Sequence, residues 1–292
     1  MRRSHVAFSA IVALLAFATL AADHARAAVL YAATAAGATG QLYTLNPASG
    51  AMVQNIGPLN DAAGANYPIT GLAFHPTTGV LYGSTGNSVA ATAARLVTIN
   101  PTTGLVTVVG SFNAGPTNSS GTPSTMGDLA FDAAGNLYGV GTIGGPQLYS
   151  INVATAQATV IGSTGLTSTT GGGIEISAAG VIYGTPTASR YGTYDGITGA
   201  FTNITNPAKP SGGGAYGALA FDGSTLYGLN VGSGSPPPTN LVTIDPATGA
   251  VTNLGASLAS LDAIAFAPIP EPTTLSLVLV SALATMSIRR RG

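Results

Sequence analysis

The sequence predicts an all-β protein, a five-bladed β-propeller with four-stranded blades and a short apolar helix at each end of the chain. Three observations predict this fold. Two strand-forming phrases alternate along the chain, most repeats are 45 residues long, and the two ends of the repeat region each supply part of one blade. A repeat of about 45 residues with four short strands is typical of a propeller blade.

Each phrase predicts two strands and a tight turn. One phrase reads ITGLAFHPTTGVLYG and the other LVTINPTTGLV. Their residues alternate between apolar and polar and are rich in β-branched and aromatic types, which favours strands. Pro presets the backbone of the turns, and Gly supplies positive φ there. The first phrase begins at Ile69, Met126, Gly172 and Tyr216, and the second at Leu42, Leu96, Leu148, Tyr191 and Leu241.

The repeat length follows from one apolar anchor in the first strand of each unit. The successive spacings between anchors are 57, 45, 45 and 45 residues, for Phe74, Phe131, Ile176, Phe221 and Phe266. The longer spacing predicts an inserted loop, which the sequence alone does not place.

The ends of the repeat region predict a closed ring. Leu261–Pro268 reads as a first strand with no second strand after it, and Val29–Ala33 as a second strand with no first strand before it. Joined, they complete one blade. Closure removes the free strand edges that invite aggregation. It also offsets the absence of disulfides in a chain without Cys.

The packing inside the ring can also be predicted. We expect small residues where the first strands crowd the axis, at Gly71, Gly173, Ala218 and Ala263, with Asp128 as the exception. The anchor phenylalanines should pack between blades, continued by a tyrosine series: Tyr31, Tyr82, Tyr138, Tyr183 and Tyr227. Phe221→Ala should therefore cost more stability than any surface change.

Charge excludes one class of function. Only 7% of the residues are charged, and between Ala28 and Pro270 three basic residues face eight acidic ones, a net charge of −5. Nucleic-acid binding needs a basic surface, so we predict no nucleic-acid partner. We also predict no cofactor and no metal site, since His75 is the one histidine of this region and thiolate ligands are absent.

The N-terminus has the pattern of a secretory signal peptide. Arg2 and Arg3 form the charged region, Val6–Ala22 is apolar, and Ala25 and Ala27 flank Arg26 as an A-x-A cleavage site for signal peptidase. The alternative is an uncleaved membrane anchor. The cleavage site and the strand-like sequence after it favour a mature start near Ala28.

The C-terminus predicts a minimal membrane span. Thr273–Ile288 is an apolar run of 16 residues, which as a helix covers about 24 Å of a bilayer core of about 30 Å. The basic cluster Arg289, Arg290 and Arg291 should stay cytoplasmic by the positive-inside rule. With an exported body, this tail would stop transfer in the inner membrane.

The tail resembles the PEP-CTERM sorting signal, which combines Pro270, Glu271 and Pro272 with a short hydrophobic helix and a basic end. The match covers about 25 residues, under a tenth of the chain. The resemblance implies a Gram-negative-type envelope and recognition by exosortase, a membrane enzyme that cuts near the motif and releases or re-anchors its cargo. The domains we expect are a signal peptide (1–27), a propeller (28–268) and a sorting tail (269–292), in a protein of the cell envelope or extracellular space.

Candidate binding residues are few. The connections that we expect on one face of the ring are long (57–68, 111–125, 203–215 and 231–240), whereas the opposite face carries short turns. Function tends to sit on loops held by a rigid scaffold, so we expect any site on the long-loop face. A shallow acidic site at the axis would use Glu175, Asp128, Asp262, Arg190 and Tyr191. The simpler interpretation, which the pattern favours, is solvated loop ends with one charge near the channel mouth.

The function that fits best is a non-enzymatic module of the envelope that binds a glycan or a protein. The alternative is a secreted lyase or hydrolase that acts on polysaccharide with carboxylates at the axis. Such an enzyme would need two acidic groups, or one and a tyrosine, within about 5–10 Å. A third interpretation, a Thr-rich solenoid, would need coils of about 20 residues, which a 45-residue period does not offer.

Overall fold

The structure is a computed structural model. It describes residues 28–268 except 36, 38, 88, 113–124, 142–146 and 168–171. Both predicted terminal helices lie outside the described residues. So do the predicted cleavage residues Ala25 and Ala27 and the predicted sorting residues Pro270, Glu271, Pro272 and Arg289–Arg291. No helix among the described residues has the length and apolar character to cross a membrane.

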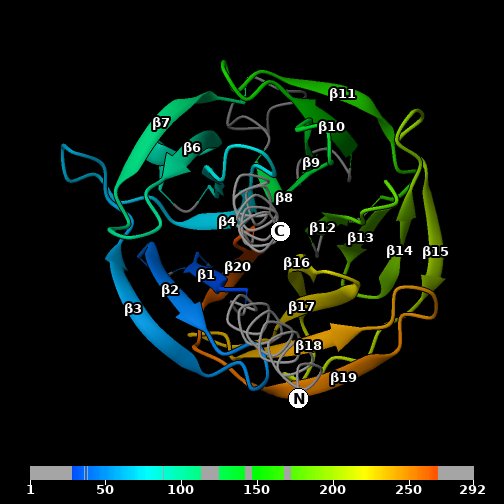
Figure 1. Cartoon of the computed structure of the whole chain (residues 1–292). Helices are drawn as coiled ribbons and strands as arrows, with labels where there is room; N and C mark the ends of the chain where they lie inside the picture. Colours follow the sequence, from blue (N-terminus) through cyan, green and yellow to red (C-terminus); the bar gives the residue numbers. More distant parts are fainter. Residues whose placement is uncertain are drawn as a thin grey trace, which may run out of the picture. The chain divides into compact units, whose positions relative to one another are not determined.

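The described residues form five four-stranded antiparallel sheets around an axis, which confirms the predicted propeller (Figure 1). Each sheet is one blade. Its strands follow one another outward from the axis in chain order, except in blade 1, where the C-terminal strand β20 is innermost. Blade 1 contains β20 (Leu261–Phe266), β1 (Leu30–Thr34), β2 (Gln41–Leu45) and β3 (Met52–Pro58). Blade 2 contains β4 (Ile69–Phe74), β5 (Leu81–Thr85), β6 (Arg95–Ile99) and β7 (Val106–Ser111).

The remaining blades follow the same order. Blade 3 contains β8 (Met126–Phe131), β9 (Leu137–Gly141), β10 (Gln147–Ile151) and β11 (Ala158–Ser163). Blade 4 contains β12 (Gly173–Ile176), β13 (Ile182–Thr187), β14 (Arg190–Tyr194) and β15 (Phe201–Thr205). Blade 5 contains β16 (Ala215–Asp222), β17 (Thr225–Val231), β18 (Thr239–Ile244) and β19 (Val251–Ala256).

The ring closes as the sequence predicts. β20 pairs with β1 in antiparallel register, with Leu30 opposite Phe266 and Ala33 opposite Ala263. Beyond the paired strands, the amide of Ala267 donates a hydrogen bond of 2.9 Å to the carbonyl of Val29. The two ends of the described chain therefore leave the ring side by side, on the face that carries the short turns.

The longer repeat belongs to blade 2. The connection from β5 to β6 is extended and contains a 3-10 helix, η1 (Ala90–Thr92). The connection from β7 to β8 is also longer than its counterparts, although residues 113–124 lie outside the described part. The insertion is therefore split between two connections on the long-loop face.

Aromatic pairs join the blades near the axis. The second-strand tyrosine of one blade packs against the first-strand phenylalanine of the next, which confirms the predicted packing. Ring centroids are 5.4, 5.4, 5.9 and 4.9 Å apart for Tyr31–Phe74, Tyr82–Phe131, Tyr183–Phe221 and Tyr227–Phe266. Such pairs contribute about 0.5–1.5 kcal/mol beyond burial. The last pair joins blade 5 to the C-terminal strand of blade 1.

Phe221→Ala should lower the free energy of unfolding by about 2 kcal/mol. The substitution removes the edge contact with Tyr183, but Phe221 keeps partial exposure, so the loss stays below the roughly 3–5 kcal/mol of a fully buried phenylalanine. Urea unfolding measures the change, with Ile197→Ala as the surface control because Ile197 is 88% exposed. Equal losses in the two variants would contradict the predicted packing role.

Glycines of the outermost strands let neighbouring blades approach at the rim. In three of the five blades the fourth strand carries a glycine close against a Ser or Thr carbonyl in a turn of the next blade. A Cβ at that glycine would lie 2.8, 1.9 and 2.4 Å from the carbonyl oxygen, for Gly110–Thr155, Gly162–Thr198 and Gly255–Ser49. At Gly57 of blade 1 the distance to the Thr103 carbonyl oxygen is 3.7 Å, an ordinary contact. Blade 4 has Thr205 at this place in β15.

Gly162→Ala should destabilise the protein by about 1–3 kcal/mol, because the added methyl group meets the Thr198 carbonyl and the turn of blade 4 must shift. The control is Gly196→Ala, where the new Cβ meets nothing closer than the Ile182 side chain at 3.4 Å. Thermal unfolding of both variants tests this. A Gly162→Ala protein as stable as Gly196→Ala would rule out the close approach at the rim.

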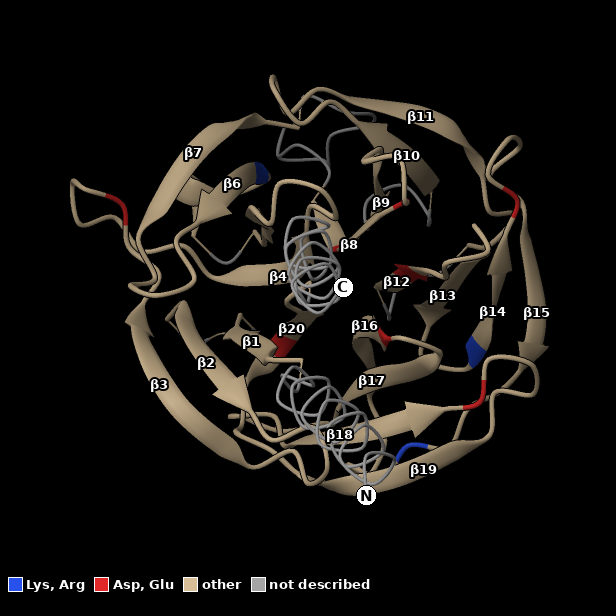
Figure 2. Ribbon diagram, viewed as in Figure 1, with Lys and Arg blue, Asp and Glu red and all other residues tan. Residues whose placement is uncertain are grey.

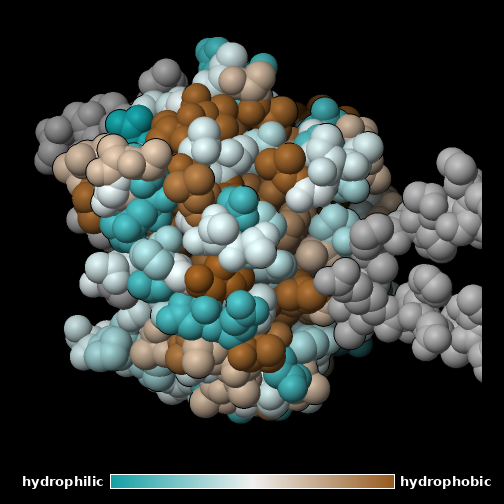
Figure 3. Space-filling view, turned by 60° about the vertical axis from the view of Figure 1, so that its left-hand side comes forward, coloured by the Kyte–Doolittle hydropathy of each residue, from teal (hydrophilic) through white to brown (hydrophobic). Residues whose placement is uncertain are grey.

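Exposed apolar side chains are scattered over the outer strands. Met52 and Val53 of β3 are 48% and 66% exposed, and Val160 of β11 is 43% exposed. On the side drawn in Figure 3, brown apolar residues are mixed with teal and white polar ones and form no continuous apolar face.

Candidate functional site

A β-bulge near the start of the first strand shapes the axis. β4, β16 and β20 each carry one residue more than the strand they pair with, at Thr70, Gly217 and Asp262. Bulges redirect a side chain and bend the strand. The Thr70 hydroxyl donates a 2.8 Å hydrogen bond to the carbonyl of Met126 in the next blade. Thr70 thus connects the first strands of blades 2 and 3.

Asp262 is the bulged residue of β20 and lies against blade 5. A Cβ on Gly217 would be 2.4 Å from its carboxylate oxygen Oδ1, so the glycine makes room for the acid. No described residue donates a hydrogen bond to this carboxyl group. Burial raises its pKa from 3.8 to about 7, although the side chain keeps some solvent contact.

Asp128 joins three blades at the axis. Its side chain is fully buried. Its Oδ2 accepts backbone hydrogen bonds of 3.1 Å from Ile174 of β12 and from Leu219 of β16. Burial raises the pKa of this carboxyl well above its usual 3.8, against the lowering effect of those amides. Its other oxygen, Oδ1, is buried without a hydrogen-bond partner.

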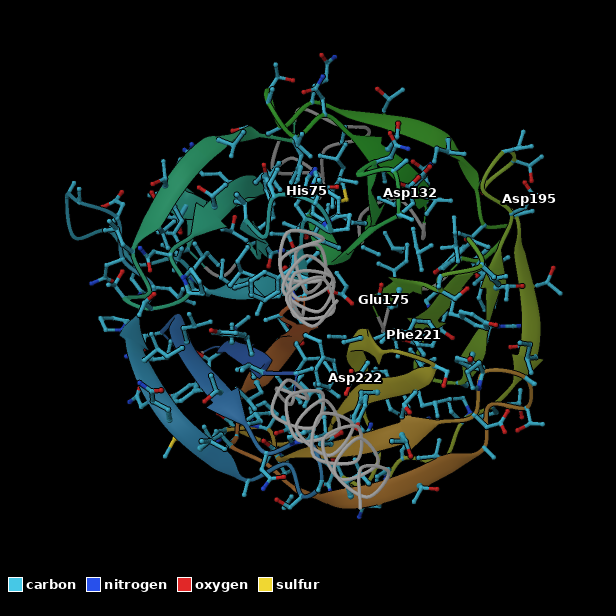
Figure 4. The ribbon with its side chains drawn as sticks, viewed as in Figure 1. His75, Asp132, Glu175, Asp195, Phe221 and Asp222 are labelled. Carbon is cyan, nitrogen blue, oxygen red and sulfur yellow. The ribbon has the colours of Figure 1, made fainter. Side chains whose placement is uncertain are left out.

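Glu175 is the third axial acid, on β12. One carboxylate oxygen, Oε1, accepts a 2.8 Å hydrogen bond from the amide of Ile176. Burial raises its pKa from 4.5 to about 8, against the hydrogen bonds from Ile176 and Phe221. Figure 4 shows Glu175 toward the centre of the ring, whereas Asp195 lies at the outer rim. The side chain of Glu175 is partly buried and keeps some contact with solvent.

The axial carboxyls have no basic partner among the described residues. The red acidic segments of β8, β12 and β20 lie on first strands nearest the axis in Figure 2. The basic residues lie farther out, with Arg95 on β6, Arg190 on β14 and Lys209 in a loop. Within the described part of the chain, no three His, Cys, Asp or Glu side chains come together as metal ligands.

Arg190 and Tyr191 do not join the axial acids. Arg190 is exposed at the start of β14, a third strand. Tyr191 is fully buried and stacks on Tyr183 with ring centroids 6.1 Å apart. Its hydroxyl donates a 3.1 Å hydrogen bond to the carbonyl of Pro246 in blade 5. Tyr191 is thus a core residue between blades 4 and 5.

Two buried tyrosines of β14 offer a matched test of this packing. Tyr191→Phe removes the bond to Pro246 and should cost about 1 kcal/mol of unfolding free energy. Tyr194→Phe removes a buried hydroxyl that has no hydrogen-bond partner, so it should leave stability unchanged or raise it. Denaturant titration of both variants distinguishes them, and a larger loss in Tyr194→Phe would contradict the assignment.

His75 has a structural role in its turn. Its Nδ1 accepts hydrogen bonds of 3.2 Å from the amides of Thr77 and Thr78. Its ring packs on Phe131, with centroids 5.0 Å apart. Asp132 holds the equivalent turn of blade 3 in the same way, by accepting from Ala134 and Asn136.

Side-chain hydrogen bonds stabilise the conformations of the described long loops. Ser211 donates from its amide to Asn230 and from its hydroxyl to Asn240, both at 2.9 Å. On the other side of the ring, Asn66 exchanges hydrogen bonds of 2.7 and 3.0 Å with the backbone of Gly40. The hydrogen bonds of these polar side chains therefore stabilise the loops.

Comparison with solved structures finds similar proteins of unknown function. One, from Bacteroides caccae, is 11% identical with a TM-score of 0.48, over 82% of this chain and 99% of that one. Another, from Bacteroides thetaiotaomicron VPI-5482, is 12% identical with a TM-score of 0.43, over 77% of this chain and 64% of that one. No curated protein matches the sequence. A family model described as a repeat of unknown function, DUF6923, matches residues 33–234, and the chain therefore belongs to that family.

Proposed function

We propose that this protein is exported to the cell envelope or extracellular matrix, where its propeller binds a glycan or a protein without catalysing a reaction. Signal peptidase would remove residues 1–27. The tail would hold the protein in the inner membrane until an exosortase-type enzyme recognises the Pro-Glu-Pro motif. The support for this address is the order of motifs at the two ends of the chain.

The observation that carries the proposal is the closure of the ring by β20 and β1. Because Ala267 and Val29 are hydrogen-bonded to each other, both address segments attach at one place on the short-turn face. Removal of either segment leaves all five sheets complete.

The axis favours binding or a structural role over catalysis. Asp128 is committed to backbone amides of two other blades. Tyr191 and Arg190, the other groups of the expected acidic site, belong to a third strand. No described pair of acid and base is brought together by hydrogen bonding at the axis.

The export proposal can be tested by changing the motif. In a Gram-negative host with an exosortase, the variant with Pro270→Ala, Glu271→Ala and Pro272→Ala should stay full-length in the inner membrane. The unchanged protein should lose its tail and reach the outer envelope or the medium. Thr273→Ala with Thr274→Ala is the neighbouring control and should be processed normally. Equal processing of all three proteins, or retention of all in the cytoplasm, would overturn the proposed address.

The alternative, a secreted lyase or hydrolase acting on polysaccharide, is favoured by one observation. The pKa of Glu175 is raised to about 8, and a carboxyl that stays protonated near neutral pH is suited to general acid catalysis. Reducing-end release from a polysaccharide panel tests it. Turnover that is lost in Glu175→Gln and kept in His75→Asn would establish the enzyme, and no turnover would exclude it for that panel.

A further inference from the structure

The short-turn end of blade 3 contains a hollow of about 400 Å³. It is lined by the turn between β8 and β9, by the end of β10, and by the start of β11. This volume lies in the range of small-molecule sites, about 300–1,000 Å³. The sequence places binding on the opposite face, so the hollow was not anticipated.

The hollow is lined by polar groups that have spare hydrogen-bonding capacity. Asn136 donates to Asp132 through Nδ2 and keeps its side-chain oxygen available. Asn152 accepts two turn amides through Oδ1 and keeps its Nδ2 donor. Within the described part of the chain, the side chains of Ser150, Gln157 and Thr159 make no hydrogen bond. Amide and hydroxyl groups, donors and acceptors both, therefore converge on one open space.

Blade 3 departs from the other repeats at this hollow. In blades 2, 4 and 5, the position equivalent to Asn136 is occupied by an apolar residue or threonine: Val80, Val181 and Thr225. In the other four blades, the position equivalent to Gln157 is occupied by alanine or leucine: Ala51, Leu105, Ala200 and Ala250. The turn also has Val153 in place of the proline of three other blades. The two amides thus depart from positions that hold apolar residues or threonine in the other blades, and both line the same space.

We infer that this hollow binds an uncharged saccharide through Asn136, Asn152 and Gln157. None of the lining residues is charged, and the nearby carboxylate of Asp132 is engaged by hydrogen bonds from Ala134 and Asn136, so the site favours an uncharged ligand. Side-chain amides both donate and accept, which suits the hydroxyl groups of a sugar. Val153 supplies an apolar surface for the carbon–hydrogen face of a sugar ring.

The inference rests on the proposed binding function and assigns its ligand class. It also moves the site to the short-turn face of blade 3, away from the axial acids.

The test uses the full-length protein in a zwitterionic detergent, which avoids glycoside head groups. The probes are immobilised neutral polysaccharides (a β-glucan, a mannan and a galactan), with alginate as the acidic comparison. Asn136→Val with Gln157→Ala introduces residues found in the other blades. The double variant should therefore fold, with a melting temperature only slightly lowered by loss of the exposed Asn136–Asp132 hydrogen bond. Gln54→Ala, an exposed amide on β3, is the matched control.

We expect one neutral polysaccharide to bind, with affinity falling at least tenfold in the double variant and staying unchanged in Gln54→Ala. Neutral binding that the double variant retains would overturn the site but leave glycan binding intact. Binding of alginate alone, or of no polysaccharide, would overturn the inferred ligand class. The export test above, which does not depend on any ligand, decides the proposed address separately.

Discussion

Asp128→Ala should lower the free energy of unfolding by about 3 kcal/mol, the largest loss that we expect from a single substitution here. The carboxyl oxygen Oδ2 is the acceptor for the amides of Ile174 and Leu219. These amides belong to first strands, which pair on one side only, so no other strand can accept from them. Each amide left buried without an acceptor costs about 1–3 kcal/mol. Two such amides account for the predicted loss.

The control for this prediction is Asp128→Asn, which keeps an oxygen in place of Oδ2. Its unfolding free energy should lie within about 1 kcal/mol of the unchanged protein, because the asparagine oxygen can accept from the same two amides. Urea unfolding of the two variants measures the difference. If alanine and asparagine destabilise equally, the two amide bonds do not hold the blades together.

The repeat was predictable from sequence because each unit repeats the same local rules. Alternation gives the strands, and turn residues such as Asn100 give the breaks. In the structure, Oδ1 of Asn100 accepts hydrogen bonds from the amides of Thr102 and Thr103 at 2.9 and 3.2 Å. The incomplete blades at the two ends of the repeat region predicted that the ring closes, and the pairing of β20 with β1 confirms this.

The role of Asp128 was not predictable, although its position was. It was identified as the exception among small axial residues. Its partners Ile174 and Leu219 lie 46 and 91 residues away in the chain, and no local pattern reports contacts of that range. The bulge that redirects Asp262 is likewise a property of pairing between β20 and β1.

The position of Tyr191 could have been inferred from the repeat itself. Its counterparts at the start of the third strand are all leucine: Leu42, Leu96, Leu148 and Leu241. Each of those leucines is fully buried, and so is Tyr191. Alignment of the repeats therefore identifies a core position, where the residue type alone suggested a binding group. The same comparison marks Asn136 and Gln157 as departures from the pattern.

The second large effect expected is on pH dependence: the full-length protein should be more stable at pH 5 than at pH 8, by roughly 2–4 kcal/mol. Burial raises the pKa of Glu175 to about 8 and of Asp262 to about 7, and that of Asp128 well above its usual value. In the unfolded chain these groups titrate near pH 4. Between pH 4 and 8 the folded state therefore holds protons that the unfolded state has released. Unfolding releases them, so stability falls as pH rises through this window.

Three aspartates at the surface act in the opposite direction but weakly. Hydrogen bonds hold the pKa values of Asp61, Asp195 and Asp245 below 3.8. Their stabilising effect is lost only as pH falls toward and below that value. Between pH 5 and 8, the change in stability is therefore determined by the axial acids.

Melting curves at pH 5, 6, 7 and 8 test this expectation. For a domain of this size, 1 kcal/mol corresponds to about 2–4 °C, so the melting temperature should fall by roughly 5–10 °C across the series. Glu175→Gln with Asp262→Asn removes two of the three groups and should flatten most of the slope, while Asp195→Asn, at the exposed rim, should leave it unchanged. A protein whose stability rises from pH 5 to 8 would show that the axial carboxyls are solvated as free acids are. The raised pKa values would then no longer support either a structural or a catalytic role for the axis.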